Sequence, residues 1–213
     1  MLRTLVCGDR YERAARAKGA THIAGVDEVG RGALFGPVVA AAVILPPKTR
    51  LPGLRDSKQL KVSDRERLAA QIESLALAIS IAEIDAATID RVNIYQATRL
   101  AMTEAVSRLA PAPDHLLIDA MRIDHPCPQT SIVYGDSLSV SIAAASVIAK
   151  IYRDNLICRL DAQFPQYGLA RHKGYGTAEH RAALLEHGPT PLHRKSFAPV
   201  AQSNLFETNE FLS

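Results

Sequence analysis

The chain has 213 residues, enough for one domain with a well-formed core, and its 47% apolar and 22% charged residues are ordinary for a folded protein. This composition excludes a disordered chain, and no apolar run approaches the roughly 20 residues that span a bilayer. The formal net charge of +3 permits a nucleic-acid ligand without requiring one. The first residues lack the apolar core and cleavage site of a secretory signal, so we expect a cytoplasmic protein with no membrane segment.

The three cysteines are scattered, at positions 7, 127 and 158, and form no C-x-x-C pair. Neither a disulfide framework nor a zinc site is therefore indicated. We expect plain reduced thiols.

Two strands are predicted close to the start of the chain. Residues 8–20 are basic and indicate a short solvated helix rather than a nucleic-acid arm. Residues 23–29 and 37–45 are apolar runs separated by a short glycine-containing turn, which predicts antiparallel neighbours. Asp27 and Glu28 lie at the end of the first run. Adjacent strand residues point to opposite faces, so one of these carboxylates must face the interior, where a bound cation would keep it ionised.

The next segment mixes helices with a third strand. A helix is predicted from Ser63, which forms a potential capping box with Glu66. Residues 78–84 alternate between apolar and polar and predict a strand. Residues 94–109 predict a longer helix, ended by Pro111.

Two short apolar runs follow, and each leads to an acid. Residues 115–119 are nearly all apolar and end in Asp119, as expected of a central strand buried on both faces. Residues 131–136 repeat the pattern, with a strand, then Gly135, then Asp136. The sequence therefore predicts a third strand end that bears a carboxylate.

The last third of the chain is predicted to be helical. Residues 139–160 form a long helix whose small apolar first half can press closely on a sheet, and residues 172–177 form a glycine-rich basic loop. Thr177 caps a helix that runs through Leu185, and residues 201–213 could add a last short helix. This order of elements predicts an α/β fold with a mixed central sheet flanked by helices and a small helical C-terminal subdomain.

Four carboxylates are predicted at the ends of three strands: Asp27, Glu28, Asp119 and Asp136. Strand ends in an α/β sheet converge on one edge, and acids crowded there repel one another unless cations lie among them. Taken singly, each acid is better explained as a helix cap or surface group. As an ordered set they predict an all-oxygen site for Mg²⁺ or Mn²⁺ rather than zinc. Two such ions can activate a water and stabilise the leaving oxygen of a phosphodiester.

These motifs resemble the bacterial ribonuclease HII (type 2 ribonuclease H) family over residues 22–200. The matching segments are residues 27–32, 36–43, 56–58, 93–98, 117–119, 135–137, 141–150, 172–177 and 193–197. Ala33 and Phe35 depart from the Pro and Ala that the family commonly has after the Gly-Arg-Gly turn. The resemblance implies a ribonuclease H-like catalytic domain at 22–200, a basic helical extension at 1–21 and a C-terminal tail at 201–213.

The resemblance also implies an activity. The family members are metal-dependent endoribonucleases that hydrolyse RNA in RNA–DNA hybrids and cut on the 5′ side of single ribonucleotides embedded in duplex DNA. They leave 3′-hydroxyl and 5′-phosphate ends. The four acids would be both the catalytic residues and the ligands of Mn²⁺ or Mg²⁺, with two ions during catalysis.

A turn and a tyrosine are the predicted readers of the substrate sugar. The glycines of Gly30-Arg31-Gly32 let the backbone approach a ribose 2′-hydroxyl, and Arg31 can hold a phosphate bidentately. In the family this turn and the tyrosine that matches Tyr175 read the junction between a ribonucleotide and the deoxyribonucleotide after it. The plainer interpretation of Tyr175 is a half-buried loop aromatic. Further predicted phosphate contacts, each of which could instead be solvated, are Lys58, Ser146, Lys150, His172 and Lys173.

The tail raises a separate hypothesis. Residues 202–206 resemble the short peptide by which bacterial DNA-repair proteins dock on the sliding clamp, with Gln202, Leu205 and Phe206 as anchors. A terminal helix that packs Leu205 and Phe206 onto the domain is the favoured alternative. We expect a monomer.

Two other functions remain open at this point. Another nuclease of the ribonuclease H-like superfamily would share the acids but lack the Gly-Arg-Gly turn and Tyr175. A non-catalytic hybrid-binding module would not need a complete set of acids.

Overall fold

The computed structural model describes residues 7–54, 57 and 60–207, with the side chains of 204–207 left out. The chain divides into two compact units. The first comprises Met1–Val29, Val39–Ala82 and Arg99–Ile151, and the second comprises Gly30–Val38, Glu83–Thr98 and Tyr152–Ser213. Each unit is described separately below.

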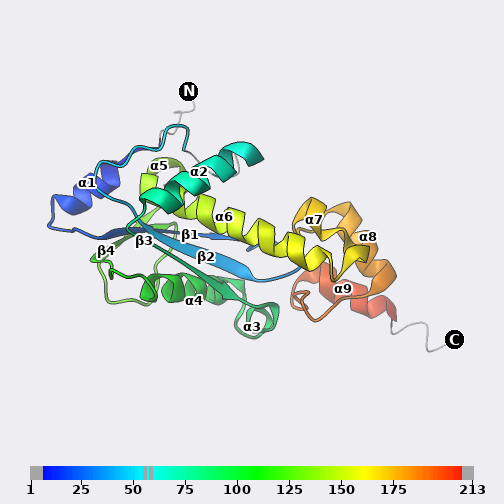
Figure 1. Cartoon of the computed structure of the whole chain (residues 1–213). Helices are drawn as coiled ribbons and strands as arrows, with labels where there is room; N and C mark the ends of the chain where they lie inside the picture. The colour runs from blue at the N-terminus through cyan, green and yellow to red at the C-terminus, as the bar shows by residue number, and fades with distance from the viewer. Residues whose placement is uncertain (1–6, 55–56, 58–59, 208–213) are drawn as a thin grey trace, which may run out of the picture. The chain divides into compact units, whose positions relative to one another are not determined.

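The first unit is built on a mixed five-stranded sheet with the order β3-β2-β1-β4-β5 (Figure 1). The strands are β1 (Ile23–Val29), β2 (Val38–Ile44), β3 (Ala78–Ile84), β4 (His115–Asp119) and β5 (Gln129–Ile132). β1 runs antiparallel to β2, as predicted, and parallel to β4, which is in turn parallel to β5. Every residue of β2 is buried, because helices cover both faces of the central strands.

Helices α2 (Val62–Leu75) and α6 (Val140–Asp161) lie on one face of this sheet and α4 (Ile94–Ser107) lies on the other (Figure 1). Small residues let α6 approach the sheet closely: a Cβ added to Gly25 would lie 2.0 Å from the backbone carbonyl carbon of Ser141. The predicted capping box at Ser63 is wrong, since α2 begins one residue earlier, with Lys61 as an N-cap that makes no side-chain bond.

The short helices α1 (Arg10–Arg16) and α5 (Gly135–Leu138) complete this unit. Glu12 on α1 is buried, and its Oε1 accepts hydrogen bonds from Ser139 Oγ (2.6 Å) and Ser141 N (2.9 Å). A carboxylate at this point offsets the positive end of the α6 dipole. Thus α1 is a structural part of the first unit as well as a basic helix.

The second unit is mostly helical, as predicted for the C-terminal subdomain. It contains α3 (Ala86–Val92), the 3₁₀ helix η2 (Pro165–Tyr167), α7 (Leu169–His172), α8 (Ala178–His187) and α9 (Ala198–Glu207). Phe35, Ile157, Tyr167 and Leu184 are buried in its apolar core. The predicted cap of α8 is confirmed, since Thr177 Oγ1 accepts a bond from His180 N at 3.2 Å. Among the described residues, no helix is both long and apolar enough to cross a membrane.

Candidate active site

The first unit places Asp27 and Asp119 side by side. The parallel register of β1 and β4 pairs Val26 with Ile118. The next position along each strand is Asp27 or Asp119, so these two residues lie level and point to the same face of the sheet. Gly25, two residues before Asp27, faces α6, which identifies this as the face that α6 covers.

Asp27 is a buried carboxylate among other carboxylates. Its side chain is 5% exposed, and its Oδ1 accepts a bond from Glu28 N at 2.8 Å. Burial, followed by the negative charges of Glu28 and Asp119, raises the pKa of Asp27 well above its ordinary value, while a hydrogen bond from Ser146 acts in the opposite direction. A cation beside these oxygens would offset both the burial of the charge and its repulsion by the neighbouring carboxylates. The buried carboxylate of Asp27 is therefore suited to a metal ion.

Ser146 serves the acid rather than a solvent-facing surface. It is buried on α6, and its Oγ lies 3.0 Å from Ser57 Oγ in addition to its contact with Asp27. The contact of Ser146 with a substrate phosphate stays a prediction. Holding the orientation of Asp27 fits its buried position.

Glu28 is half-buried and follows Asp27 on the strand, so the two side chains leave opposite faces of β1, as predicted. Glu28 still lies near enough for its charge to raise the pKa of Asp27. Its place at the end of the strand allows it to approach a ligand from the other side.

The fourth acid reaches the same edge by a different route from the one predicted. β5 ends at Ile132, Tyr134 takes a left-handed conformation (φ 59°), and Asp136 lies in α5 instead of at a strand end. Gly135 N donates to Asp119 Oδ1 at 2.7 Å. A Cβ on Gly135 would lie 2.6 Å from Ile142 Cδ1, so a larger residue would require the end of the Ile142 side chain to move. Asp136 is thus buried one residue from a direct contact with Asp119.

The carboxylates fit a divalent cation that keeps part of its own shell. Among the described residues, no three His, Cys, Asp or Glu side chains form a group that could hold a metal ion by themselves. Mg²⁺ is usually held by one or two carboxylates together with waters and substrate phosphates. The level pair of Asp27 and Asp119 matches that mode of binding, since all its donors are oxygens.

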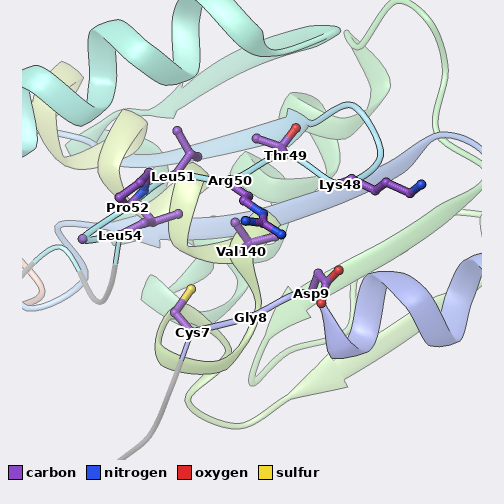
Figure 2. Close-up of a pocket in the computed structure, with 11 residues that line it drawn as sticks. Cys7, Gly8, Asp9, Lys48, Thr49, Arg50, Leu51, Pro52, Leu54 and Val140 are labelled. Carbon is purple, nitrogen blue, oxygen red and sulfur yellow. The ribbon is translucent and has the colours of Figure 1, made fainter.

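A separate cavity of about 570 Å³ lies in the first unit, lined by Cys7, Asp9, Lys48, Arg50 and Val140 among others (Figure 2). Burial, then the charges of Glu12 and Asp136, raises the pKa of Cys7 to about 12, so its thiol is inert at neutral pH. The lining includes none of the residues that the sequence predicts for the site.

In the second unit, the two glycines of the Gly-Arg-Gly turn differ in what surrounds them. Gly30 has φ 91°, and a Cβ there would lie 2.2 Å from Arg153 Nε. Gly32 is exposed, and a Cβ there would meet no protein atom within 4 Å. Packing therefore requires glycine at position 30, whereas Gly32 leaves open space beside exposed backbone. Arg31 between them is exposed.

Two fully buried arginines hold the backbone of this turn and of the residues that follow it. Arg153 donates to the carbonyl oxygens of Phe35 (3.0 Å), Pro37 (3.1 Å) and Lys173 (2.9 Å). Arg194 donates to the carbonyl oxygens of Gly36 (3.0 Å) and Arg31 (2.9 Å). Burial and the neighbouring Arg153 lower the pKa of Arg194 to about 9.

The sequence analysis missed the supporting role of both arginines, because nothing in the local sequence distinguishes a buried arginine from one on the surface. Their only signal was position: Arg194 lies in the matched segment 193–197, and Arg153 lies three residues beyond Lys150.

Tyr175 lies beside the same turn. Its backbone forms an isolated antiparallel bridge with Ala33, and its half-buried ring lies under Arg153, with Cζ 5.6 Å from the ring centroid. The guanidinium is attracted to the face of the ring. Tyr175 and the Gly-Arg-Gly turn thus share one buried cation as their support.

Comparison with known proteins identifies the family of this chain. The Ribonuclease HII family profile matches residues 24–200. This chain is 58% identical over 200 residues to the ribonuclease HII of Koribacter versatilis, covering 94% of this chain and 79% of the relative. The chain belongs to the ribonuclease HII family.

Solved structures of this family and of ribonuclease H2 share the fold. The ribonuclease H2 of Pyrococcus horikoshii superposes with a TM-score of 0.75 at 22% identity, over 86% of this chain and 97% of that one. The ribonuclease HII of Archaeoglobus fulgidus, solved in a complex with PCNA, gives a TM-score of 0.71 at 25% identity, over 83% and 95%.

The predicted phosphate contacts of His172 and Lys173 differ in how far the structure leaves their side chains available. His172 is 9% exposed, its Nε2 donates to Tyr167 O at 2.9 Å, and its Nδ1 accepts from Gly174 N at 3.3 Å. Both ring nitrogens are therefore used inside the protein, and the phosphate contact of His172 stays a prediction. Lys173 Nζ donates to Ala170 O at 2.6 Å.

Lys150 is half-buried on α6. Lys58 lies outside the described residues, as do the side chains of Leu205 and Phe206. Gln202 on α9 is exposed. For these residues the substrate and clamp contacts stay predictions.

Proposed function

We propose that this chain is a divalent-metal-dependent endoribonuclease that hydrolyses the RNA of RNA–DNA hybrids and cuts duplex DNA 5′ of embedded ribonucleotides. Membership of the ribonuclease HII family supports the activity. The observation that carries it in this structure is the level pair of Asp27 and Asp119 on neighbouring parallel strands.

The acids act by holding negative charge in a fixed place. Asp27 and Asp119 are oriented by the strand register, Asp27 additionally by Ser146, and Asp119 by the amide of Gly135. We assign Glu28 and Asp136 to the same metal set. When bound, Mg²⁺ or Mn²⁺, with two ions engaged during catalysis, would supply Lewis-acid stabilisation of the phosphate and a more acidic water. Rigid placement of these ligands is what makes such stabilisation effective.

The reaction transfers a phosphoryl group to water. A bond forms between the water oxygen and phosphorus, the bond from phosphorus to the 3′ oxygen breaks, and that oxygen receives a proton. The products are a 3′-hydroxyl and a 5′-phosphate, which are the ends that the family leaves.

The second unit carries the proposed sugar recognition. The exposed backbone at Gly32 can bond a ribose 2′-hydroxyl, Arg31 can contact a phosphate, and Tyr175 can stack on the deoxyribose that follows. Of the basic residues, Lys58, Lys150 and Lys173 are the proposed phosphate contacts, which would supply affinity without base readout.

The experiment is cleavage of an end-labelled duplex that carries one ribonucleotide, with Mg²⁺, Mn²⁺ or a chelator. We expect a single cut on the 5′ side, only with metal. Asp27→Asn and Asp136→Asn should abolish it while the fold is kept, and Asp124→Asn, which changes an exposed acid of the first unit, should cut normally. Near-normal turnover by Asp27→Asn or Asp136→Asn would refute the assignment of the acids.

We further propose that the protein acts as a cytoplasmic monomer and docks on a sliding clamp through Gln202, Leu205 and Phe206. The complex of the Archaeoglobus fulgidus relative with PCNA supports a clamp contact in the family. A pull-down with the sliding clamp tests it, and unchanged binding after Leu205→Ala and Phe206→Ala would end this idea in favour of a packed terminal helix.

A further inference from the structure

Three histidines are buried in the second unit, and the proposed chemistry uses none of them. His172, His180 and His193 are 9%, 0% and 1% exposed. The Nε2 atoms of His180 and His193 lie 3.1 Å apart, and the rings of His172 and His180 stack with centroids 4.6 Å apart and planes inclined by 17°. Three buried rings in contact need a consistent set of protons.

The hydrogen bonds define that set. Thr190 N donates to His193 Nδ1 at 2.9 Å, so this nitrogen carries no proton and the neutral ring of His193 is protonated at Nε2. His193 Nε2 must then donate to His180 Nε2. His180 is therefore protonated at Nδ1, which lies 3.0 Å from the carbonyl oxygen of Tyr175. We call this series from Thr190 to Tyr175 the histidine chain.

The histidine chain ends on the backbone that carries the sugar-reading tyrosine. Tyr175 O accepts from His180 Nδ1 and from Thr177 N (2.8 Å), while Tyr175 N donates to His172 O (3.0 Å). The preceding residue, Gly174, donates to His172 Nδ1. Apart from the isolated bridge to Ala33, these bonds take the place of the sheet ladder that orients the acids of the first unit.

We propose that the histidine chain positions Tyr175, and so sets how strictly the enzyme distinguishes a ribonucleotide–deoxyribonucleotide junction from continuous RNA. The inference rests on the role of Tyr175 in the proposed function. His180 and His193 are positioning residues, since they act on the substrate only through Tyr175.

The arrangement requires both rings to be neutral. A second proton on His180 would set its Nε2–H against that of His193 across 3.1 Å, and a second proton on His193 would set its Nδ1–H against Thr190 N–H across 2.9 Å. Burial, then the neighbouring His180, lowers the pKa of His193 to about 3, and burial lowers the pKa of His180. The ionisable groups that face the chain are His172, which opposes charge on His180, and Glu179, which favours it. The hydrogen bonds of the histidine chain are therefore all formed at neutral pH.

Two substitutions of similar size separate the two nitrogens of His180. The amide nitrogen of asparagine can take the place of Nδ1, and the amide of glutamine that of Nε2. His180→Asn thus keeps a donor for Tyr175 O, and His180→Gln removes it. Both variants lose the stacked ring, so a merely structural role would affect them alike.

The readout is the ratio of kcat/KM on a duplex with one junction to kcat/KM on a hybrid whose cut strand is all RNA. We expect Tyr175→Ala to lower this ratio, His180→Gln to lower it about tenfold and His180→Asn to stay within about threefold of the parent, as the loss of one positioning hydrogen bond implies. His187→Gln is the matched control, because His187 lies on the same helix and edge-on to Tyr167 but outside the chain. Its ratio should not change.

A double variant tests the route of action. If His180 acts through Tyr175, adding His180→Gln to Tyr175→Ala should lower the ratio no further, whereas independent effects would multiply. A multiplied loss, or equal ratios for His180→Gln and His180→Asn, would overturn the inference.

Failure of the proposed function gives a different result. If the parent protein does not cut the junction duplex, the function is wrong. If the parent cuts, Tyr175→Ala lowers the ratio and the His180 variants leave it alone, only the histidine chain is wrong.

Should the His180 variants not fold, ¹⁵N spectra of the parent protein still decide the point. We expect a proton on Nδ1 of His180 and on Nε2 of His193 at neutral pH. A proton on Nε2 of His180 would overturn the inference.

Discussion

The two units hold their functional groups by opposite means. In the first unit, strand register aligns Asp27 with Asp119, so the functional side chains are oriented by a regular backbone. In the second unit, Tyr175 and the Gly-Arg-Gly turn lie on irregular backbone. Buried side chains stabilise this backbone by donating hydrogen bonds to its carbonyl oxygens. The first unit uses backbone to place side chains, and the second uses side chains to place backbone.

The buried charges differ in the same way. The first unit crowds carboxylates, which raises the pKa of Asp27, and a bound cation would favour its charged form. The second unit buries the cations Arg153 and Arg194, whose guanidinium groups donate hydrogen bonds to backbone carbonyl oxygens. Substitutions in the first unit should therefore affect activity more than stability, and those in the second unit should affect stability directly.

The largest expected effect is at Asp119. Asp119→Asn keeps an oxygen that can accept from Gly135 N, but it removes charge from the level pair. Cleavage should fall by about 1000-fold, as the loss of several kcal/mol of transition-state stabilisation implies. The melting temperature in chelator should not fall, because a repulsion with Asp27 is relieved. Single-turnover kinetics and calorimetry measure both, and a large drop in melting temperature would contradict the comparison.

Arg153 should show the reverse pattern. Arg153→Ala leaves one buried and two part-buried carbonyl oxygens without their donor, and we expect the free energy of unfolding to fall by about 3 kcal/mol. Arg153→Lys keeps a charge but not the planar fork, so its loss should be smaller. Denaturant titration checks the pair. A loss below about 1 kcal/mol for alanine would show that Arg153 does not support the loops.

The two glycines of the turn sharpen the comparison within one unit. Gly30→Ala should cost about 2 kcal/mol, because it combines a left-handed backbone with a clash against Arg153. Gly32→Ala should stay within about 0.5 kcal/mol of the parent, since a Cβ there meets nothing, yet it should raise KM for the junction duplex. Equal stability of the two variants would remove the distinction drawn between packing and ligand approach.

The effect that is smallest at neutral pH, and grows only in acid, concerns His193. Folding lowers the pKa of His193 from 6.5 to about 3, so between these values the unfolded state binds the extra proton. The free energy of unfolding therefore has the full contribution of this group above pH 6.5. It falls as the pH drops toward 3, by up to about 1.4 kcal/mol per pH unit from His193 alone. Denaturant titrations of the parent and His193→Gln across this range should differ in slope, with the flatter curve for the variant. Parallel curves would show that His193 does not titrate in this way.

Local pattern was enough for many of the elements. The hairpin of β1 and β2 followed from two apolar runs and a short turn, and the start of α8 followed from Thr177. Prediction from local pattern was wrong at two places where the structure follows another conformation. The capping box at Ser63 did not form, and Asp136 came from a short helix after a left-handed Tyr134 instead of from a strand.

The sequence by itself determined the family and the main elements and predicted the four acids, because these depend on periodicity and on motifs of a few adjacent residues. Only the tertiary structure decided that His172 faces inward and that Arg153 and Arg194 support the turn. The physical reason is distance along the chain: Arg153 bonds a carbonyl 118 positions away and Arg194 one 163 positions away. A cation whose partners are distant backbone oxygens looks, in the sequence, the same as one in water.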